Sequence, residues 1–247
     1  MRLSALLGGF VIALLASSSV HAATVSAAVA ANFVKPAEEL GAAFKARTGD
    51  DVVFSFGATG ALYNQISQAA PFEVFLAADS KRPTQAVTDG LGVKGSVFTY
   101  AVGKVVLYSP SIDLTDGAAV LAGGDFQHIA IADPKTAPYG AAAVETIEKL
   151  GLTDVIAPKQ VVGENISQAL HFVDSGSAEL GFVALSQVID KPALQLWRVP
   201  RDNYSPILQD AVLLKTGEAN PAAMAFLEFL QSDEGKAIIA KYGYEFE

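Results

Sequence analysis

Strand-like runs alternate with helical patterns along almost the whole chain, and this order constrains the fold more than any other feature. Phe33, Leu40 and Phe44, for example, recur at helical spacing after a β-rich run. The expected strands are 23–30, 51–56, 72–76, 128–132, 160–162, 180–184 and 207–214, and the expected helices are 33–47, 61–69, 81–88, 114–121, 140–150, 167–174, 221–231 and 233–241. This alternation predicts an α/β fold with a mostly parallel sheet covered on both faces.

The middle of the chain departs from the regular alternation of short strands and helices. Residues 97–108 form a long β-rich stretch interrupted by Gly103, which is long enough to leave one sheet and enter another, and residues 207–214 form a possible return strand. This arrangement predicts two lobes joined by two crossings, with residues 23–102 and 207–247 in one lobe and 103–206 in the other. Two lobes of this kind close around a ligand by a hinge motion. The pattern alone also allows one continuous sheet.

The first 22 residues have the composition of a secretory signal peptide. Arg2 is followed by an apolar stretch at residues 5–16, and Val20 and Ala22 place small residues before a cleavage site. The apolar stretch of about 12 residues is shorter than the roughly 20 needed to span a bilayer. We therefore expect cleavage after Ala22 and a periplasmic protein.

The charge and the absence of cysteine exclude several classes of partner and chemistry. Removing the signal peptide, with its one Arg and no acids, leaves 16 basic and 26 acidic residues, a net charge of 16 − 26 = −10. Nucleic-acid binding requires clustered Lys and Arg, so we expect no nucleic-acid partner. Because the chain has no Cys, it has no disulfide, thiol nucleophile or thiolate metal ligand.

Enzyme motifs are missing from the sequence. Beyond the signal peptide only His128 and His171 remain, and the one arrangement that suggests a hydrolase is His171 with Asp174 on the same expected helix. No G-x-S-x-G, H-E-x-x-H, P-loop or G-x-G-x-x-G motif accompanies them. We therefore predict that the protein is not an enzyme, with a hydrolase built on His171 and Asp174 as an alternative.

Small and amide residues occupy four junctions where an expected strand leads into an expected helix. They are residues 30–32 (Ala-Ala-Asn), 57–60 (Gly-Ala-Thr-Gly), 136–140 (Thr-Ala-Pro-Tyr-Gly) and 163–167 (Gly-Glu-Asn-Ile-Ser). The start of a helix leaves backbone N–H groups unpaired and carries roughly half a positive charge. Several such starts directed at one cleft would bind an anion without Lys or Arg. Ordinary helix capping is the alternative interpretation of each junction.

Segments spread over essentially the whole mature chain resemble the periplasmic molybdate-binding proteins of ABC transporters. They are VSAAVAANFVKPAEELGAAF, DVVFSFGATGALYNQI, APFEVFLAAD, IADPKTAPYG, GENISQAL, AELGFVALSQV and GKAIIAKYGYEF, in the order of that family. The resemblance implies a two-lobed, type II-like fold, each lobe a mixed sheet flanked by helices, with the ligand in the interlobe cleft. It also implies molybdate or tungstate as ligand, no cofactor, and a membrane permease with a cytoplasmic ATPase as partner. We expect a monomer.

The same resemblance implies the residues that hold the oxyanion. Asn32 takes the position of a first-loop donor, and the backbone of Ala31 and Asn32 faces the ligand. Thr59 corresponds to a Ser or Thr that donates through its hydroxyl and backbone N–H. Tyr139 and Ile166 correspond to backbone N–H donors. No side chain coordinates a metal directly in this arrangement.

One residue departs from the family pattern, and the departure concerns the affinity and choice of anion more than the fold. Many relatives carry a ligand-binding Tyr where this chain has Ala184, and Asn32 and Tyr139 are the residues expected to compensate. Sulfate, thiosulfate and ferric iron remain alternative ligands. The iron alternative predicts clustered Tyr, His or carboxylate ligands, whereas only Tyr139 lies in a candidate loop.

Overall fold

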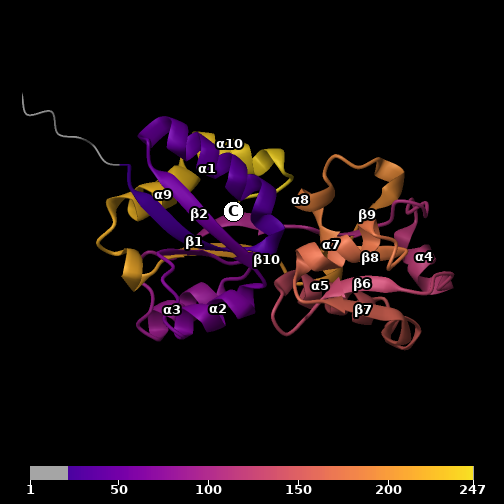
Figure 1. Cartoon of the computed structure of the whole chain (residues 1–247). Helices are drawn as coiled ribbons and strands as arrows, with labels where there is room; N and C mark the ends of the chain where they lie inside the picture. The colour runs from indigo at the N-terminus through magenta and orange to yellow at the C-terminus, as the bar shows by residue number, and fades with distance from the viewer. Residues whose placement is uncertain (1–21, 247) are drawn as a thin grey trace, which may run out of the picture.

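The chain folds into two lobes, each built on its own five-stranded sheet (Figure 1). The computed structural model describes residues 22–246, so the signal-peptide prediction concerns residues outside the described part, apart from Ala22. The two-lobed prediction is confirmed, and the alternative of one continuous sheet is wrong. Within residues 22–246 no helix combines the length and the apolar character that a membrane crossing requires.

The first lobe contains both ends of the described chain. Its sheet has the order β2-β1-β3-β10-β4, in which β1, β2 and β3 are parallel and β10 is antiparallel to both of its neighbours. Its strands are β1 (Thr24–Ala30), β2 (Asp51–Gly57), β3 (Val74–Leu76), β4 (Phe98–Gly103) and β10 (Ile207–Leu213). Its helices are α1 (Val34–Thr48), α2 (Thr59–Ser67), α3 (Lys81–Thr88), α9 (Pro221–Gln231) and α10 (Asp233–Lys241), with the short 3-10 helices η1 (Ala31–Phe33) and η5 (Lys215–Gly217).

Alternation along the strands of this lobe supplies a core on each face of the sheet. Val25 and Val29 of β1 pack with Phe44 and Phe226 from α1 and α9. Ala28, between them, belongs to the opposite core, which the helices α2 and α3 cover. Successive strand residues point to opposite faces, so a strand that is buried on both sides appears in the sequence as a continuous apolar run.

The second lobe has the strand order β7-β6-β8-β5-β9, and β5 is the strand that runs antiparallel to its neighbours. Its strands are β5 (Val105–Tyr108), β6 (Ile129–Ala132), β7 (Gln160–Gly163), β8 (Leu180–Ala184) and β9 (Leu196–Arg198). Its helices are α4 (Gly117–Gly123), α5 (Pro138–Lys149), α6 (Thr153–Ile156), α7 (Ile166–Asp174) and α8 (Leu185–Val188), with 3-10 helices η2 (Ala157–Lys159), η3 (Ala193–Gln195) and η4 (Arg201–Asn203).

The chain passes between the two sheets twice. The β-rich stretch divides after Gly103, and Lys104 alone separates β4 in the first sheet from β5 in the second. Residues 199–206 link β9 to β10 and form the return crossing. The short strand β9 was not predicted, because three residues after a turn carry too little periodicity to be recognised.

Two helices begin two residues earlier than their hydrophobic spacing predicts. α2 starts at Thr59 rather than residue 61, and α5 starts at Pro138 rather than residue 140. Proline is favoured in the first helical turn because it needs no hydrogen-bond partner for its nitrogen. The shift places the small residues of two junctions inside the first helical turns instead of in separate loops.

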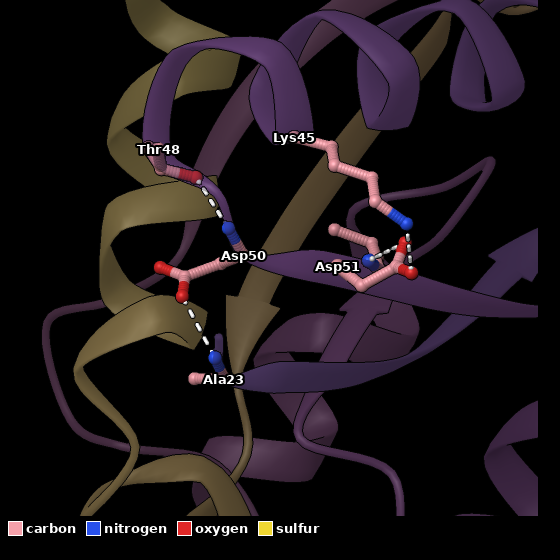
Figure 2. Close-up of polar contacts among 6 residues, drawn as sticks. Ala23, Lys45, Thr48, Asp50 and Asp51 are labelled. Atoms are coloured by element: carbon pink, nitrogen blue, oxygen red, sulfur yellow. Dashed lines mark hydrogen bonds and ion pairs between the residues drawn. The ribbon is translucent and has the colours of Figure 1, made fainter. Parts of the chain in front are cut away.

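Polar side chains fix the edge of the first sheet where β1 and β2 begin (Figure 2). Asp50 accepts a hydrogen bond from the backbone N–H of Ala23 at 2.8 Å, and its own N–H donates to Thr48 Oγ1 at 3.1 Å. Lys45 Nζ lies 2.6 Å from Asp51 Oδ2 on an exposed surface. These contacts align the starts of both strands, which run in register to Ala30 and Gly57 at the opposite edge.

Candidate functional site: an uncharged cavity between the lobes

One small cavity lies where four helix starts from the two lobes meet. It is lined by Ala30, Ala31, Asn32, Gly57, Ala58, Thr59 and Ala78 from the first lobe and by Ala137, Pro138, Tyr139, Asn165 and Ile166 from the second. The empty space among these residues is about 200 Å³. The cavity lies at the carboxyl ends of β1, β2, β6 and β7, the edge at which open α/β sheets bind ligands.

All five residues predicted from the sequence therefore lie around the same cavity. Each is nearly inaccessible to solvent, with exposures between 1% for Thr59 and 5% for Ala31. The exposures of Asn32, Tyr139 and Ile166 fall between these two values. The junctions that sequence pattern could not place relative to one another converge because β1–β2 and β6–β7 are parallel pairs whose carboxyl ends face each other across the cleft.

Backbone N–H groups of these residues have no acceptor within the protein. Across residues 22–246, no hydrogen bond engages the N–H of Ala31, Asn32, Thr59, Tyr139 or Ile166. Each residue belongs to the first turn of its helix, where N–H groups point out along the helix axis. Buried N–H groups are nearly always paired in folded proteins, so a convergent unpaired set indicates a ligand.

The hydroxyl of Thr59 adds a side-chain donor to this set. Its Oγ1 accepts a hydrogen bond from the backbone N–H of Ala78 at 3.1 Å. A hydroxyl carries one hydrogen, and within the described chain no protein acceptor takes it. That hydrogen is therefore free for an acceptor in the cavity.

The cavity lining contains no acidic or basic side chain. A larger cavity, with about 880 Å³ of empty space, lies nearby, and its lining includes Lys81, Arg82, Glu145 and residues 205–208. We do not regard it as the anion site, because the guanidinium of Arg82 already pairs with Asp79 and donates to Lys135 O at 3.1 Å. The smaller cavity has the unpaired donors.

Contacts across the cleft show that the lobes are closed around the cavity. The N–H of Gly60 donates to Thr136 O at 2.9 Å. Ser167 Oγ donates to Ala31 O at 3.1 Å, and Ser186 Oγ donates to Asn32 O at 2.8 Å. Each pair joins an element of the first lobe to one of the second.

The side chain of Asn32 turns away from the role of direct donor that the resemblance implies. Its Nδ2 donates to Gln209 Oε1 and to Tyr244 Oη, both at 2.8 Å, so both amide hydrogens are used within the protein. Tyr100 Oη lies 3.1 Å from the same Gln209 Oε1. The amide thus anchors the first loop to a buried polar network, and the backbone N–H of Asn32 remains the unpaired donor.

Tyr139 joins that network from the other lobe. Gln209 Nε2 donates to Tyr139 Oη at 3.1 Å. The backbone of Gly103 allows this approach, because a Cβ there would lie 2.2 Å from the Tyr139 hydroxyl. Burial raises the pKa of Tyr139 well above its usual value, and burial likewise raises the pKa of Tyr244 to about 12, so these phenols stay protonated donors and acceptors.

Sequence reasoning missed the partners in this network. Gln209, Tyr244, Ser186 and Tyr100 are all buried, yet they come from distant parts of the chain. The only signal was weak: Gln209 and Asp210 interrupt an otherwise apolar strand, where the structure has a β-bulge.

The remaining candidate residues lie away from the cavity. Ala184 is fully buried at the end of β8 and does not line the cavity. His171 is exposed on α7, and Asp174 accepts a hydrogen bond from Tyr108 at 3.2 Å. Among the described residues no group of three or more His, Cys, Asp or Glu is placed to hold a metal ion.

Two closed lobes around a buried, uncharged set of N–H donors define a binding protein for a small solute. Residues 25–245 match the family model of bacterial extracellular solute-binding proteins, and the chain belongs to that family. It is 54% identical over 223 residues to a molybdate-binding protein of Rhodobacter capsulatus, covering 90% of this chain and 88% of the relative. It is 50% identical over 234 residues to a molybdate-binding protein of Azotobacter vinelandii, covering 93% of each.

The solved structure of a periplasmic molybdate-binding protein from Azotobacter vinelandii has the same fold. It superposes with a TM-score of 0.87 at 38% sequence identity and covers 90% of this chain and 99% of its own. The predicted fold class is thus confirmed. The hydrolase alternative is not supported, because the chain belongs to a family of solute-binding proteins.

Proposed function

We propose that this protein binds molybdate, and also tungstate, between its lobes and delivers it to an ABC transporter. The observation that carries the proposal is the convergence of unpaired N–H groups on a closed cavity without charged side chains. The similarity to molybdate-binding relatives at 50% identity and above supports this choice of anion.

In this proposal the ligand contacts come from Ala31, Asn32, Thr59, Tyr139 and Ile166. Each would donate its backbone N–H, and Thr59 would also donate its hydroxyl. Asn32 would contribute through its backbone, because its amide is engaged by Gln209 and Tyr244. Hydrogen bonds to a charged group stabilise a complex by about 1.5–3 kcal/mol each, so such a set is sufficient for tight binding.

The donor set also accounts for selectivity. A fully ionised tetrahedral dianion presents only acceptors, and the lining offers only donors at the proposed contacts. Protonated phosphate brings a hydrogen that needs an acceptor. Sulfate is smaller than molybdate, so it would leave donors stretched or unpaired, at a cost of about 1–3 kcal/mol for each buried group.

We further propose that residues 1–22 are a cleaved signal peptide and that the mature protein works in the periplasm as a monomer. Its partner would be a permease with a cytoplasmic ATPase. We assign residues 23–102 and 207–247 to one lobe and 103–206 to the other, a division supported by the membership of β4 and β10 in one sheet and of β5 in the other.

Comparative calorimetry tests the choice of ligand. Titrating the purified mature protein with molybdate, tungstate, sulfate and phosphate should give sub-micromolar binding for the first two. Two poorly satisfied donors would weaken sulfate by about 100-fold or more. Sub-micromolar binding of sulfate without binding of molybdate would overturn the proposal in favour of a different oxyanion.

A further inference from the structure

The C-terminal end of the described chain returns to the hinge between the lobes. α10 ends at Lys241, and Gly243 adopts a left-handed conformation, with φ +81°, that reverses the direction of the backbone. Glu245 then pairs with Val102 of β4: Val102 N donates to Glu245 O at 2.7 Å, and Glu245 N donates to Val102 O at 3.1 Å. The last residues therefore lie beside the strand that leads into the first crossing.

The carboxylate of Glu245 contacts both crossings between the lobes. Its Oε1 lies 2.5 Å from Nζ of Lys104, the residue between β4 and β5. Its Oε2 pairs with the guanidinium of Arg201, which belongs to the return crossing. One side chain thus joins the two segments about which the lobes turn.

The neighbouring Tyr244 connects the same chain end to the cavity. Its buried Oη lies 3.0 Å from Ser186 Oγ of the second lobe. The Asn32 amide donates to that phenol at 2.8 Å, and Ser186 Oγ donates to Asn32 O at 2.8 Å. Tyr244 Oη also lies 2.9 Å from Asn32 O, so its one hydrogen has an acceptor in each lobe. When the phenol donates to Ser186 Oγ, the contacts form a closed ring in which the amide donates to the phenol, the phenol to the Ser186 hydroxyl, and that hydroxyl to the Asn32 carbonyl.

This ring requires the lobes to be closed. Asn32 and Tyr244 belong to the first lobe, whereas Ser186 lies on α8 of the second. Opening the cleft would separate the Ser186 hydroxyl from Asn32 O and from Tyr244 Oη, whereas the contact between Tyr244 Oη and Asn32 O lies within the first lobe and would remain. The ring therefore favours the closed arrangement through contacts that do not involve an anion.

We propose that Tyr244 is a positioning residue and that Tyr244 and Glu245 form a strap that holds the lobes closed and sets the rate of anion release. Tyr244 acts through Asn32, whose loop it fixes beside the cavity, and Glu245 holds the strap against both crossings. The binding readout rests on the proposed function, but the effect on closure does not. Because apparent affinity scales with the population of the binding-competent state, a strap that raises this population tightens binding without contacting the ligand.

The test compares two tyrosines of the same chain end. Tyr244→Phe removes the hydroxyl that reaches Ser186. Tyr242→Phe is the matched control, because the hydroxyl of Tyr242 donates at 2.6 Å to Glu39 on α1, within the first lobe. The chain has no Cys, so Ala46→Cys on α1 and Thr153→Cys on α6, both exposed, can carry a donor and an acceptor dye, one on each lobe.

Single-molecule energy transfer in anion-free buffer should show a smaller closed fraction for Tyr244→Phe than for the unmodified protein. Chasing bound molybdate with excess tungstate should show release accelerated about tenfold, with an association rate changed by less than about threefold. Tyr242→Phe should match the unmodified protein in both measurements. If Tyr244→Phe does not fold, Ser186→Ala removes the same ring from the other lobe and should have the same effects.

Two results would overturn the strap. One is an unchanged closed fraction in Tyr244→Phe or Ser186→Ala. The other is an equal effect of Tyr242→Phe, which would indicate general loosening of the chain end. A closed fraction that falls as expected in a protein that binds no molybdate would instead contradict the proposed ligand and leave the strap in place.

Discussion

Three helices that begin away from the cavity differ from the helical segments that begin at it in how their first turns are satisfied. α4, α9 and α10 begin after Asp116, Asn220 and Ser232, and each of these side chains accepts a hydrogen bond from an N–H of the first turn. The helical segments that start at η1, α2 and α5 follow Ala30, Ala58 and Ala137, and none of these has a side-chain cap. Alanine is among the poorest N-cap residues.

The capped helix starts therefore stabilise the fold, whereas the helix starts at the cavity are available to a ligand. At the capped starts a polar side chain satisfies the helix, and the donors are no longer available. At the cavity, methyl side chains leave the donors unpaired and let a ligand approach the backbone. The fourth cavity helix, α7, combines both: Asn165 caps the N–H groups of Ser167 and Gln168, while that of Ile166 stays unpaired.

Converting a cavity start into a capped start should have the largest effect. Ala58→Asp places a carboxylate at the N-cap of α2, where it can satisfy the first turn itself and repel an anion. A pair of unit charges at 4 Å interacts by about 4 kcal/mol at an effective dielectric constant near 20. We expect molybdate affinity to fall by about 1,000-fold or more, measured by calorimetry, while the folded protein is retained.

Ala58→Asn separates charge from capping in the same position. It offers a neutral cap, so it should weaken binding less than Ala58→Asp. Equal, small effects of the two substitutions would contradict the assignment of this helix start to the anion site.

Removing one side-chain donor should have an intermediate effect. Thr59→Val keeps the shape of the side chain but deletes the hydroxyl, and one charge-assisted hydrogen bond corresponds to about 1.5–3 kcal/mol, or roughly 10- to 150-fold in Kd. Thr59→Val also leaves the N–H of Ala78 without its partner, so the melting temperature of the anion-free protein should fall by a few degrees.

Thr59→Ser is the control for this prediction. It retains the hydroxyl and should bind molybdate nearly as tightly as the unmodified protein. If Thr59→Val bound molybdate with unchanged affinity, the hydroxyl would have no part in the site.

The reciprocal change at a capped start should affect stability alone. Asp116→Ala deletes the acceptor for the N–H of Ala119 on α4, and loss of an N-cap costs about 0.5–2 kcal/mol. Urea unfolding should detect this loss, while calorimetry should give the same molybdate affinity. A loss of molybdate affinity in Asp116→Ala as large as that in Thr59→Val would contradict the distinction between the two kinds of helix start.

The smallest effect concerns pH. Burial raises the pKa of Tyr100 and Tyr139 well above the ordinary value near 10, and that of Tyr244 to about 12. The folded state therefore holds more protons than the unfolded state above pH 10. The stability that these phenols contribute should be complete below pH 10 and lost as pH rises from 10 towards 12 and beyond.

Thermal unfolding measured from pH 8 to 11 checks this direction. Tyr100→Phe should reduce the slope above pH 10, because one of the titrating groups is gone. A steeper slope in Tyr100→Phe than in the unmodified protein would contradict the expected direction of the pH dependence of stability.

Much of this architecture could be predicted from the sequence, because buried parallel strands and amphipathic helices have local signatures. Gly103 indicated where the chain leaves the first sheet, and the structure has β4 end at that residue. The junction residues could be predicted individually, since alanine and glycine stand where caps are expected. Their convergence could not, because it depends on how two separate sheets face each other.

The buried network was beyond the reach of sequence pattern for a similar reason. Asn32, Ser186, Gln209 and Tyr244 are separated by up to 212 positions, and no local spacing relates them. The resemblance implied a ligand-binding side chain at Asn32, and the structure instead gives that amide two protein acceptors. Polar residues that pair across lobes become visible only once the fold is closed.

The central claim is that uncharged helix starts, and not basic side chains, hold the anion. A crystal structure of the protein with molybdate, with the metal located by its anomalous scattering, tests this most directly. The account predicts one molybdenum peak in the cavity, with oxygens about 2.7–3.1 Å from the nitrogens of Ala31, Thr59 and Ile166. A peak beside Lys81 and Arg82 in the neighbouring cavity, with the five N–H groups unengaged, would contradict it.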